Sequence, residues 1–555
     1  MKQRLFWLIG LLLPLLLLAM LELTLRLAGI GKQLALFIDN PANTHYLLTR
    51  PDIIKRYFAN GAAAPTVTME PSFFLQQRPA DGIRLVVQGG STAAGYPYGV
   101  GASLAGMLEQ RLRRSAGNRS VEVVNTALSA VNSYTLLDLA DEIIAIKPDA
   151  VLIYAGHNEY LGIMGAGSTY LAAESPAATR WLLKLRRLST FQLLEGAYQH
   201  CCLPGAVETA ASDRRTLMAR VAQGQHITTD SALYQAGIQQ FSQNLALLLA
   251  KYQTAGIAVY LATTGSNIAD QAPFAGAPLT EQQLSKLAQF QAQIDTGVAL
   301  KDLDNATERL LGDAPSAHLL YQLGQLYRRG GEAERASQLL LAAKDADSLR
   351  FRAPEAINQQ IRILAKQYNA KLVDVEAAWR QQSPLGLIGN NLMLEHLHPN
   401  VQGYFLLADS FYQALAQQPP LSDWPGKVAA ELAWAERPLL PAEEHAAQLR
   451  VVTLMADYPF RDTPIAVSFP AAQNMPQQLA QAYIDGKLDW LGMMQQSARY
   501  YQQQRDGDML LKALLIIADA LPHDASANRQ AAQILQQAGR AQEAGHYQRR
   551  AELAH

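Results

Sequence analysis

The stretch Leu85-Val86-Val87-Gln88-Gly89-Gly90-Ser91-Thr92 decides the fold. Its apolar, β-branched beginning predicts a buried strand, and the paired glycines predict a sharp turn that presents Ser91 at the carboxyl end of that strand. Reacting groups gather at this end of the strands in a parallel sheet. Ser91 is therefore a candidate nucleophile, which would need a base, a group that orients the base, and donors for an oxyanion.

Short apolar runs and amphipathic segments alternate along the chain on both sides of this stretch. Strands are predicted at 85–88, 121–124, 150–154, 258–262 and 371–375, and helices at 104–114, 134–146, 234–252, 356–368 and 403–415. Such apolar strands, separated by helices, indicate a parallel sheet that is covered on both faces. We therefore expect an α/β fold with a doubly wound parallel sheet over residues 81–420.

Two further motifs supply the other parts of a serine acyl-transfer site. Asn158 follows the strand predicted at 150–154, and Glu395 lies three residues before His398 in Glu395-His396-Leu397-His398-Pro399. A neutral imidazole can take the serine proton while a carboxylate holds its tautomer. The spacing favours His398 over His396 as the base.

These motifs together resemble the SGNH (GDSL-type) hydrolase superfamily over about residues 80–420. The resemblance implies the triad Ser91, Glu395 and His398, with Glu395 where the family has Asp. It implies an oxyanion hole made by the main-chain N–H groups of Ser91 and Ala130 and the side-chain amide of Asn158. Ala130 stands where the family has Gly, and its N–H can serve if its φ stays negative. No metal and no organic cofactor are implied.

Other interpretations of these residues are weighed against this one. A phosphate-binding loop would need a Lys after its glycines, and the elbow of an α/β-hydrolase would need Gly where Ala93 stands. Ser91 could also be a structural turn serine, and His157 is expected to shape its loop. Arg350 and Arg352 could hold an anionic substrate, although a solvated or ion-paired role is favoured.

The resemblance implies a serine esterase or acyl hydrolase that forms an acyl-enzyme, with O-acyl groups of envelope glycans or lipids as candidate substrates. Two alternatives stay open: an O-acyltransferase that passes the acyl group to a saccharide, and an inactive envelope scaffold, which the departures at Ala130 and Glu395 favour. The formal net charge of -1 argues against a nucleic-acid partner, which normally meets a basic face.

The N-terminal residues carry a separate signal. The apolar run Leu5–Leu21, which follows Lys2 and Arg4, predicts a signal anchor or transmembrane helix over residues 1–27. This interpretation makes the chain a single-pass membrane protein whose bulk is periplasmic or extracytoplasmic, and a cleaved signal peptide is the alternative. Residues 28–80 are rich in proline, and we expect a linker or arm there.

Helical segments are predicted in two further places. A helical insertion is expected at about 270–350, where Leu323-Gly324-x-x-Tyr327 is similar to the tetratricopeptide (TPR) pattern. Residues 421–475 are expected to be a linking segment and residues 476–555 a TPR-like helical region. Stacked helical hairpins suit a protein partner.

Overall fold

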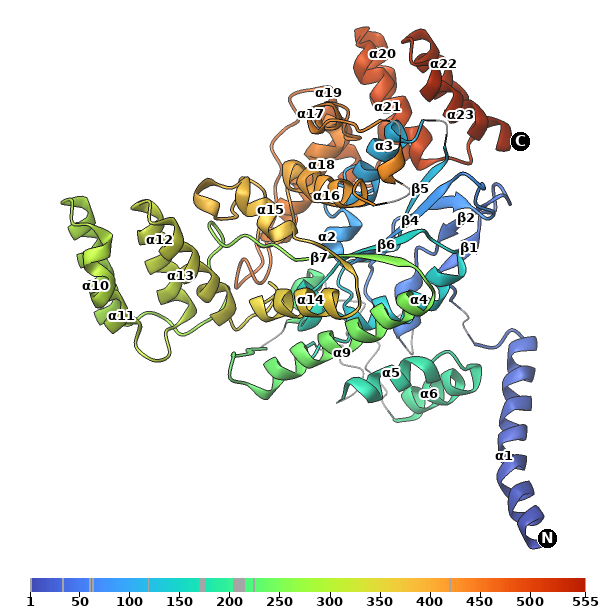
Figure 1. The fold of residues 1–555 in the computed structure, drawn as a ribbon, viewed down its shortest axis with the longest axis horizontal. Helices are drawn as coiled ribbons and strands as arrows, with labels where there is room; N and C mark the ends of the chain where they lie inside the picture. Colours follow the sequence, from blue (N-terminus) through green and yellow to red (C-terminus); the bar gives the residue numbers. More distant parts are fainter. Residues whose placement is uncertain are drawn as a thin grey trace.

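A five-stranded parallel sheet lies at the centre of the computed structural model (Figure 1). The structure describes residues 2–31, 34–58, 61, 64–117, 119–168, 175–202, 215–222, 225–418, 421–424 and 426–554. The strands are β4 (Ile83–Gly89), β5 (Val121–Asn125), β6 (Ala150–Tyr154), β7 (Ala258–Ala262) and β8 (Lys371–Val373), in the order β5-β4-β6-β7-β8. Because β5 and β6 lie on opposite sides of β4, the connections diverge at β4, and in open α/β sheets ligands bind at the carboxyl end of the strands at such a point.

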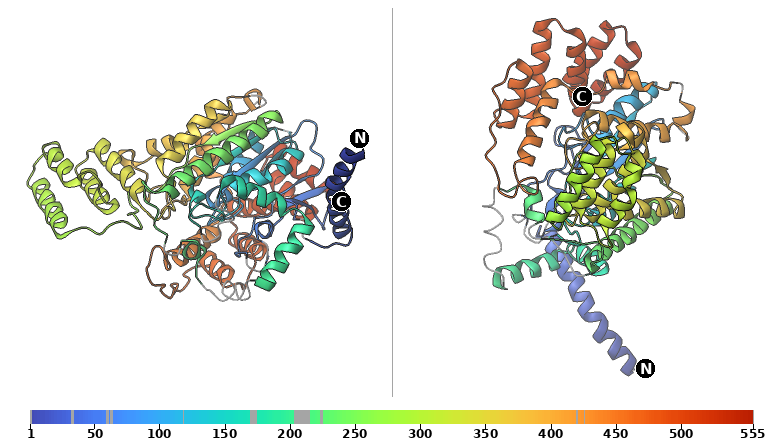
Figure 2. Two further views of the ribbon diagram at one scale, coloured as in Figure 1. Left: turned by 90° about the horizontal axis from the view of Figure 1, so that it is seen from below. Right: turned by 90° about the vertical axis from the view of Figure 1, so that its left-hand side faces the viewer.

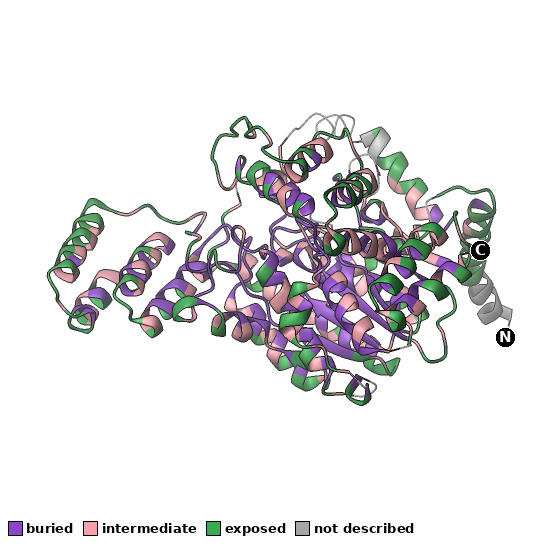
Figure 3. Ribbon diagram, turned by 90° about the horizontal axis from the view of Figure 1, so that it is seen from above, coloured by how far each residue is buried: buried purple, intermediate pink, exposed green. Residues whose placement is uncertain are grey.

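Helices cover both faces of this sheet, as predicted. One face packs under α3 (Leu104–Ser115), α15 (Val375–Gln381) and α16 (Val401–Leu415), and the other under α4 (Ser133–Ala145), α9 (Ala232–Thr254) and α14 (Glu355–Gln367). The strands form the most continuously buried part of the molecule (Figure 3). All five predicted strands and all five predicted helices are present, so the α/β parallel-sheet class is confirmed.

Residues 37–75 contain structure that the proline-rich sequence did not predict. Three short strands, β1 (Phe37–Asp39), β2 (Tyr46–Thr49) and β3 (Phe73–Leu75), form an antiparallel sheet, and the 3-10 helix η1 (Ile53–Tyr57) lies between β2 and β3. Arg84 of β4 donates to the Leu75 carbonyl at 2.5 Å and pairs with Glu122 at 2.8 Å. The arm is thereby fixed to the edge of the main sheet.

The predicted insertion consists of helices that project from the sheet (Figure 1). They are α10 (Glu281–Asp295), η4 (Leu300–Leu303), α11 (Asp304–Leu311), α12 (Ala317–Arg329) and α13 (Ala333–Ala346). A Cβ on Gly324 would lie 2.7 Å from Cγ of Leu340, so glycine lets α12 and α13 approach closely. A helical hairpin is therefore present, while its relation to TPR repeats stays a prediction.

The C-terminal region is helical, as predicted. Its helices are α18 (Pro441–Met455), α19 (Met475–Ile484), α20 (Trp490–Gln504), α21 (Gly507–Ala520), α22 (Ala525–Gln537) and α23 (Ala541–Leu553). The segment expected to link the two regions contains α18 and also η6 (Leu421–Asp423) and α17 (Ala430–Ala435). Arg113 of α3 pairs with Asp519 and donates to Tyr547 Oη at 2.7 Å, so the tail docks on the sheet domain.

The predicted membrane anchor is wrong. Across the part of the chain that the structure describes, no helix has the length and apolar character needed to cross a bilayer. The apolar run that suggested an anchor, Leu5–Leu21, falls short of the roughly 20 residues that a spanning helix needs. It ends at Glu22 within α1 (Lys2–Leu27), and the Glu22 carboxylate accepts hydrogen bonds from Ser189 and Thr190 of α6 at 2.9 and 2.8 Å.

Among the described residues between β6 and α9 are the helices α5 (Pro176–Leu185), α6 (Ser189–Cys202) and α8 (Leu217–Val221). Helices α5 and α6 lie beneath the sheet domain on the side of α1 (Figure 1). The C-terminal helices and the free end of α1 lie at opposite ends of the molecule (Figure 2).

Candidate functional site

Ser91 is the first residue of the short helix α2 (Ser91–Ala94), directly after β4. A Cβ on Gly89 would lie 2.1 Å from the Tyr154 carbonyl oxygen of β6, so only glycine lets the strand end turn here. Gly90 is the N-cap and has no side chain to accept the first N–H groups of the helix. The main-chain N–H of Ser91 has no acceptor among the described residues and stays available.

Glu395 and His398 lie in a tight loop between β8 and α16. Met393 and Pro399 form an isolated antiparallel bridge, and the Leu394 N–H donates to the His398 carbonyl at 2.9 Å. Two hydrogen bonds join this loop to the segment that follows β7. Asn267 donates its main-chain N–H to the His396 carbonyl at 2.9 Å and its amide to the Glu395 carbonyl at 3.1 Å.

Ser91, His398 and Glu395 form a continuous hydrogen-bonded chain. The distance from His398 Nε2 to Ser91 Oγ is 2.8 Å, and His398 Nδ1 bonds to Glu395 Oε1. The same carboxylate oxygen accepts the His398 main-chain N–H at 2.8 Å. An ionised carboxylate can only accept, so Nδ1 carries the proton and the Nε2 lone pair faces the serine hydroxyl.

The electrostatics of the site keep this imidazole neutral at neutral pH. Burial lowers the pKa of His398 to about 3, and its exposed fraction is 6%. The Glu395 carboxylate opposes this shift, because a negative charge favours the imidazolium. Burial also lowers the pKa of His157 to about 3 and that of His396 well below its usual value. Three neutral imidazoles therefore lie in one buried cluster.

His396 contacts the triad but does not reach the serine through any described hydrogen bond. Its main-chain N–H donates to Glu395 Oε2 at 2.7 Å, and its Nδ1 contacts the same oxygen. The ring is surrounded by aromatic side chains, with centroid distances of 5.3 Å to Phe274 and 5.5 Å to Phe460. The geometry therefore favours His398 as the base over His396.

Glu395, His396 and His398 also have ligand atoms that lie close enough together to hold a metal ion. A metal site needs these atoms to converge on one point that the ion can occupy. Here Nδ1 of each histidine faces an oxygen of the carboxylate instead. The arrangement fits a hydrogen-bonded triad better than a coordination site.

The predicted oxyanion donors lie on two loops beside Ser91. A Cβ on Gly90 would lie 2.8 Å from Asn158 Nδ2, which places the amide next to the nucleophile turn. This amide donates one hydrogen bond to the Val131 carbonyl at 3.1 Å, and its second hydrogen has no acceptor within the part of the chain that the structure describes. The main-chain N–H of Ala130 has no acceptor among the described residues.

Ala130 departs from the expected backbone conformation. Its φ is +62°, whereas the sequence analysis required a negative φ. Alanine occupies here a left-handed conformation that favours glycine, at a cost of about 1–2 kcal/mol. The predicted negative φ is therefore wrong, and the part of the Ala130 N–H in the oxyanion hole stays a prediction.

Sequence reasoning missed two residues that shape the site. Asn267 fixes the acid–base loop, and its only signal was its place just past the end of a predicted strand. The Tyr96 ring lies against His398, with centroids 4.7 Å apart.

Arg352 proves to be structural, because it pairs with Asp347 at 3.1 Å and donates to the Asn267 carbonyl at 2.9 Å. Arg350 likewise donates to main-chain carbonyls.

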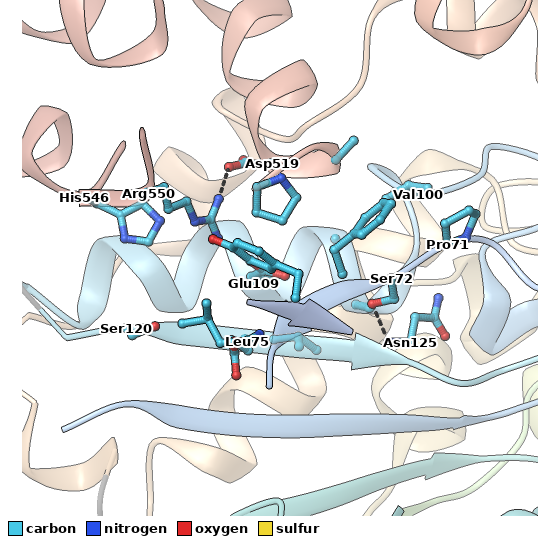
Figure 4. A pocket seen from close by; sticks show the side chains of 18 of the residues that line it. Pro71, Ser72, Leu75, Val100, Glu109, Ser120, Asn125, Asp519, His546 and Arg550 are labelled. Atoms are coloured by element: carbon cyan, nitrogen blue, oxygen red, sulfur yellow. Dashed lines mark hydrogen bonds and ion pairs between the residues drawn. The ribbon is translucent and has the colours of Figure 1, made fainter. Parts of the chain in front are cut away.

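A cavity of about 390 Å³ lies elsewhere, between α3, the arm and the C-terminal helices (Figure 4). None of the triad residues lines it. Arg550 at its wall pairs with Glu109 at 3.5 Å and with Asp519 at 3.4 Å. The cavity thus lies where the tail docks on α3, away from Ser91, His398 and Glu395.

Comparisons with known proteins give distant likenesses. No protein-family model matches the chain, and no curated protein matches it in sequence. Among solved structures, the acetylxylan esterase Axe2 from Geobacillus stearothermophilus is 14% identical, with a TM-score of 0.28, and covers 61% of this chain and 96% of its own. The acetyl xylan esterase AlAXEase is 14% identical, with a TM-score of 0.28, covering 60% of this chain and 100% of its own.

A proposed lipolytic protein of the G-D-S-L family from Desulfitobacterium hafniense is 13% identical, with a TM-score of 0.27, and covers 60% of this chain and all of its own length. TM-scores this low carry no argument about what the present chain does. The solved structures that it resembles are thus described as esterases and a lipolytic protein, and its own chemistry has to be inferred from Ser91, His398 and Glu395.

Proposed function

We propose that the chain is a serine ester hydrolase. The observation that carries this proposal is the unbroken chain of hydrogen bonds from Ser91 Oγ through the His398 imidazole to Glu395. A neutral, buried imidazole with its lone pair on a serine hydroxyl is the arrangement that activates a nucleophile. The free N–H groups beside it supply what the negatively charged intermediate needs.

The reaction follows from this geometry in two halves. His398 Nε2 takes the Ser91 proton while Oγ bonds to the ester carbonyl carbon, and the carbonyl oxygen becomes an oxyanion held by Ser91 N–H, Ala130 N–H and the Asn158 amide. The intermediate collapses when His398 gives its proton to the leaving alkoxide, leaving an acyl group on Ser91. Water then attacks the acyl carbon by the same route and releases the acid.

One departure from the family pattern is compatible with this machinery, because Glu395 reaches Nδ1 of His398 despite its extra methylene. The other departure is not resolved in its favour, because the positive φ of Ala130 does not meet the condition set for its N–H. The inactive-scaffold alternative therefore loses the support of Glu395 and keeps that of Ala130. We propose O-acyl groups of glycans or lipids as the substrate class, on the strength of the resemblance to SGNH hydrolases.

Labelling with a fluorophosphonate probe tests the proposal. The wild-type chain should be labelled at Ser91 and hydrolyse a short-chain p-nitrophenyl ester, and Ser91→Ala should lose both. His398→Ala should lower kcat by about four to six orders of magnitude, because triad members act as a unit. His396→Ala is the matched control and should cost far less. Probe labelling that survives in Ser91→Ala, or a greater loss in His396→Ala, would overturn the assignment.

A further inference from the structure

We propose that Glu159 is a positioning residue that fixes the separation of the two loops that carry the oxyanion donors, one with Ala130 and one with Asn158. This inference rests on the proposed function, since it assigns Glu159 a part in forming the oxyanion hole. Glu159 directly follows Asn158 in the 3-10 turn η3 (His157–Glu159), its carboxylate bonds to α4 and α9, and only 1% of its surface is exposed.

The Glu159 carboxylate joins three elements. Its Oε1 accepts from Ser133 Oγ at 2.6 Å and from Gln240 Nε2 of α9 at 2.6 Å, and its Oε2 accepts the Ser133 main-chain N–H at 3.2 Å. Ser133 begins α4, three residues after Ala130. One buried carboxylate thus ties the turn that carries Asn158 to the segment that carries Ala130.

Two further hydrogen bonds join the same two loops, and we call these bonds together with those of Glu159 the frame. The Asn158 amide donates to the Val131 carbonyl at 3.1 Å, and the Ile163 N–H donates to the Ala130 carbonyl at 2.7 Å. The two loops are therefore joined directly by these two bonds and a second time through Glu159. Moving Glu159 would change the separation of the two donors, and a 1 Å error at such a site can cost about 100-fold in rate.

The Ser133 hydroxyl, the Ser133 main-chain N–H and the Gln240 amide all donate to Glu159, so the frame needs the ionised carboxylate. Ser133 Oγ also accepts from Asn244 at 2.9 Å, which fixes the serine proton toward Glu159. A protonated carboxyl or a glutamine at position 159 carries a donor of its own, which would face one of the Ser133 or Gln240 donors. Buried donors left without an acceptor cost about 1–3 kcal/mol each, which favours a shift of the loop.

The frame also predicts a dependence on pH. Burial raises the pKa of Glu159 to about 7, against the lowering effect of the Ser133 and Gln240 hydrogen bonds. The charged and titratable groups around it are Tyr134 of α4, Tyr160 and Arg180 of α5, which donates to Asn244 at 2.9 Å. Burial raises the pKa of both tyrosines, so neither titrates near pH 7.

Steady-state kinetics of Glu159→Gln on a p-nitrophenyl ester test the proposal. We expect kcat to fall at least about 10-fold with KM within about twofold, because the donors act on the oxyanion more than on the ester. Wild-type kcat should decline as pH falls through about 7. This decline, the acid limb of the pH profile, should be absent from Glu159→Gln. A Glu159→Gln enzyme with wild-type kcat and the wild-type limb would overturn the inference.

Glu443 provides a matched control. It is also a buried glutamate whose pKa burial raises to about 7, and it accepts from Trp490 Nε1 at 2.9 Å and from the Leu440 N–H at 3.0 Å, in the C-terminal region. Glu443→Gln should lose similar stability yet keep kcat and the pH limb. An equal loss of kcat in both variants would show that Glu159 acts only through stability.

Ser133→Ala keeps the proposal testable if Glu159→Gln does not fold. It removes one donor and leaves the carboxylate, so kcat should fall less than in Glu159→Gln, and the double variant should be no worse than Glu159→Gln alone. Additive losses would overturn the inference. A wild-type chain that the fluorophosphonate does not label at Ser91 would instead overturn the proposed function, and this inference with it.

Discussion

Substitutions at Ala130 test whether its main-chain N–H takes part in the oxyanion hole. Its φ of +62° costs alanine about 1–2 kcal/mol that glycine would not lose. Ala130→Gly should keep kcat and change the free energy of unfolding by less than about 1 kcal/mol, because the relief of strain is offset by the greater entropy of glycine in the unfolded chain.

Ala130→Val is the informative partner of this substitution. A β-branched residue is a genuine outlier at positive φ, so the segment should shift and take its N–H away from the oxyanion. We expect kcat on a p-nitrophenyl ester to fall at least about 10-fold, with a loss of stability in urea unfolding. Wild-type turnover in Ala130→Val would mean that this N–H takes no part in the reaction.

The candidate site was partly predictable from sequence. Ser91, Glu395 and His398 occur in compact motifs whose residue types and spacing already suggest acyl transfer, and the structure brings them together. Glu159 and Asn267 could not be found in this way. Their roles come from partners 26 and 128 residues away, so only the folded arrangement reveals them.

At the scale of elements, burial decides which strands a sequence reveals. Strands β4, β5 and β6 of the main sheet are buried along their whole length and are rich in apolar residues. Strands β1, β2 and β3 have three or four residues and lie in a proline-rich segment, where no alternating pattern stands out. The apolar run at the N-terminus misled because its length lies at the limit between a buried helix and a spanning one.

The docking of the tail on α3 leads to a prediction about truncation. Removing residues 476–555 deletes Asp519 and Tyr547, the partners of Arg113, together with the apolar contacts of α21. A chain of residues 1–475 should therefore melt at a lower temperature and still hydrolyse a small ester within about threefold of the full chain, because Ser91, Glu395 and His398 remain. Thermal unfolding and kcat measure the two effects.

Arg113 and Asp519 provide the control within the full chain. Since both side chains are mostly buried, Arg113→Gln and Asp519→Asn should each destabilise the protein, and their double-mutant cycle should show coupling above about 0.5 kcal/mol. A soluble, folded truncation without turnover would show that the tail contributes to the active site. Whether the same helices bind a protein partner stays a prediction from their TPR-like pattern.

Across the whole molecule, buried histidines make stability depend on pH. Burial lowers the pKa of His157 and His398 to about 3, and those of His396 and His546 well below 6.5. As pH falls below 6.5, the unfolded chain takes up these protons and the folded chain does not. Each such histidine lowers the free energy of unfolding by about 1.4 kcal/mol per pH unit.

Buried glutamates oppose this trend over part of the range. The pKa of Glu159 and of Glu443 is raised to about 7, so between pH 7 and 4.5 the folded chain takes up protons that the unfolded chain does not. Stability should therefore fall gradually from pH 6.5 to 4.5 and more steeply below 4.5, where both states hold the glutamate protons. Urea unfolding at several pH values measures this, and a profile that is flat below pH 6.5 would contradict it.

The distance along the chain between the nucleophile and its base determines when the enzyme can first act. Ser91 and His398 are 307 residues apart in sequence, and the loop that holds the base is followed directly by α16, which packs under the sheet. A ribosome that adds about 5–20 residues per second needs roughly 15–60 s to cover that interval. A growing chain therefore displays its serine for most of its synthesis with nothing to activate it, and hydrolysis begins only once the sheet domain is complete.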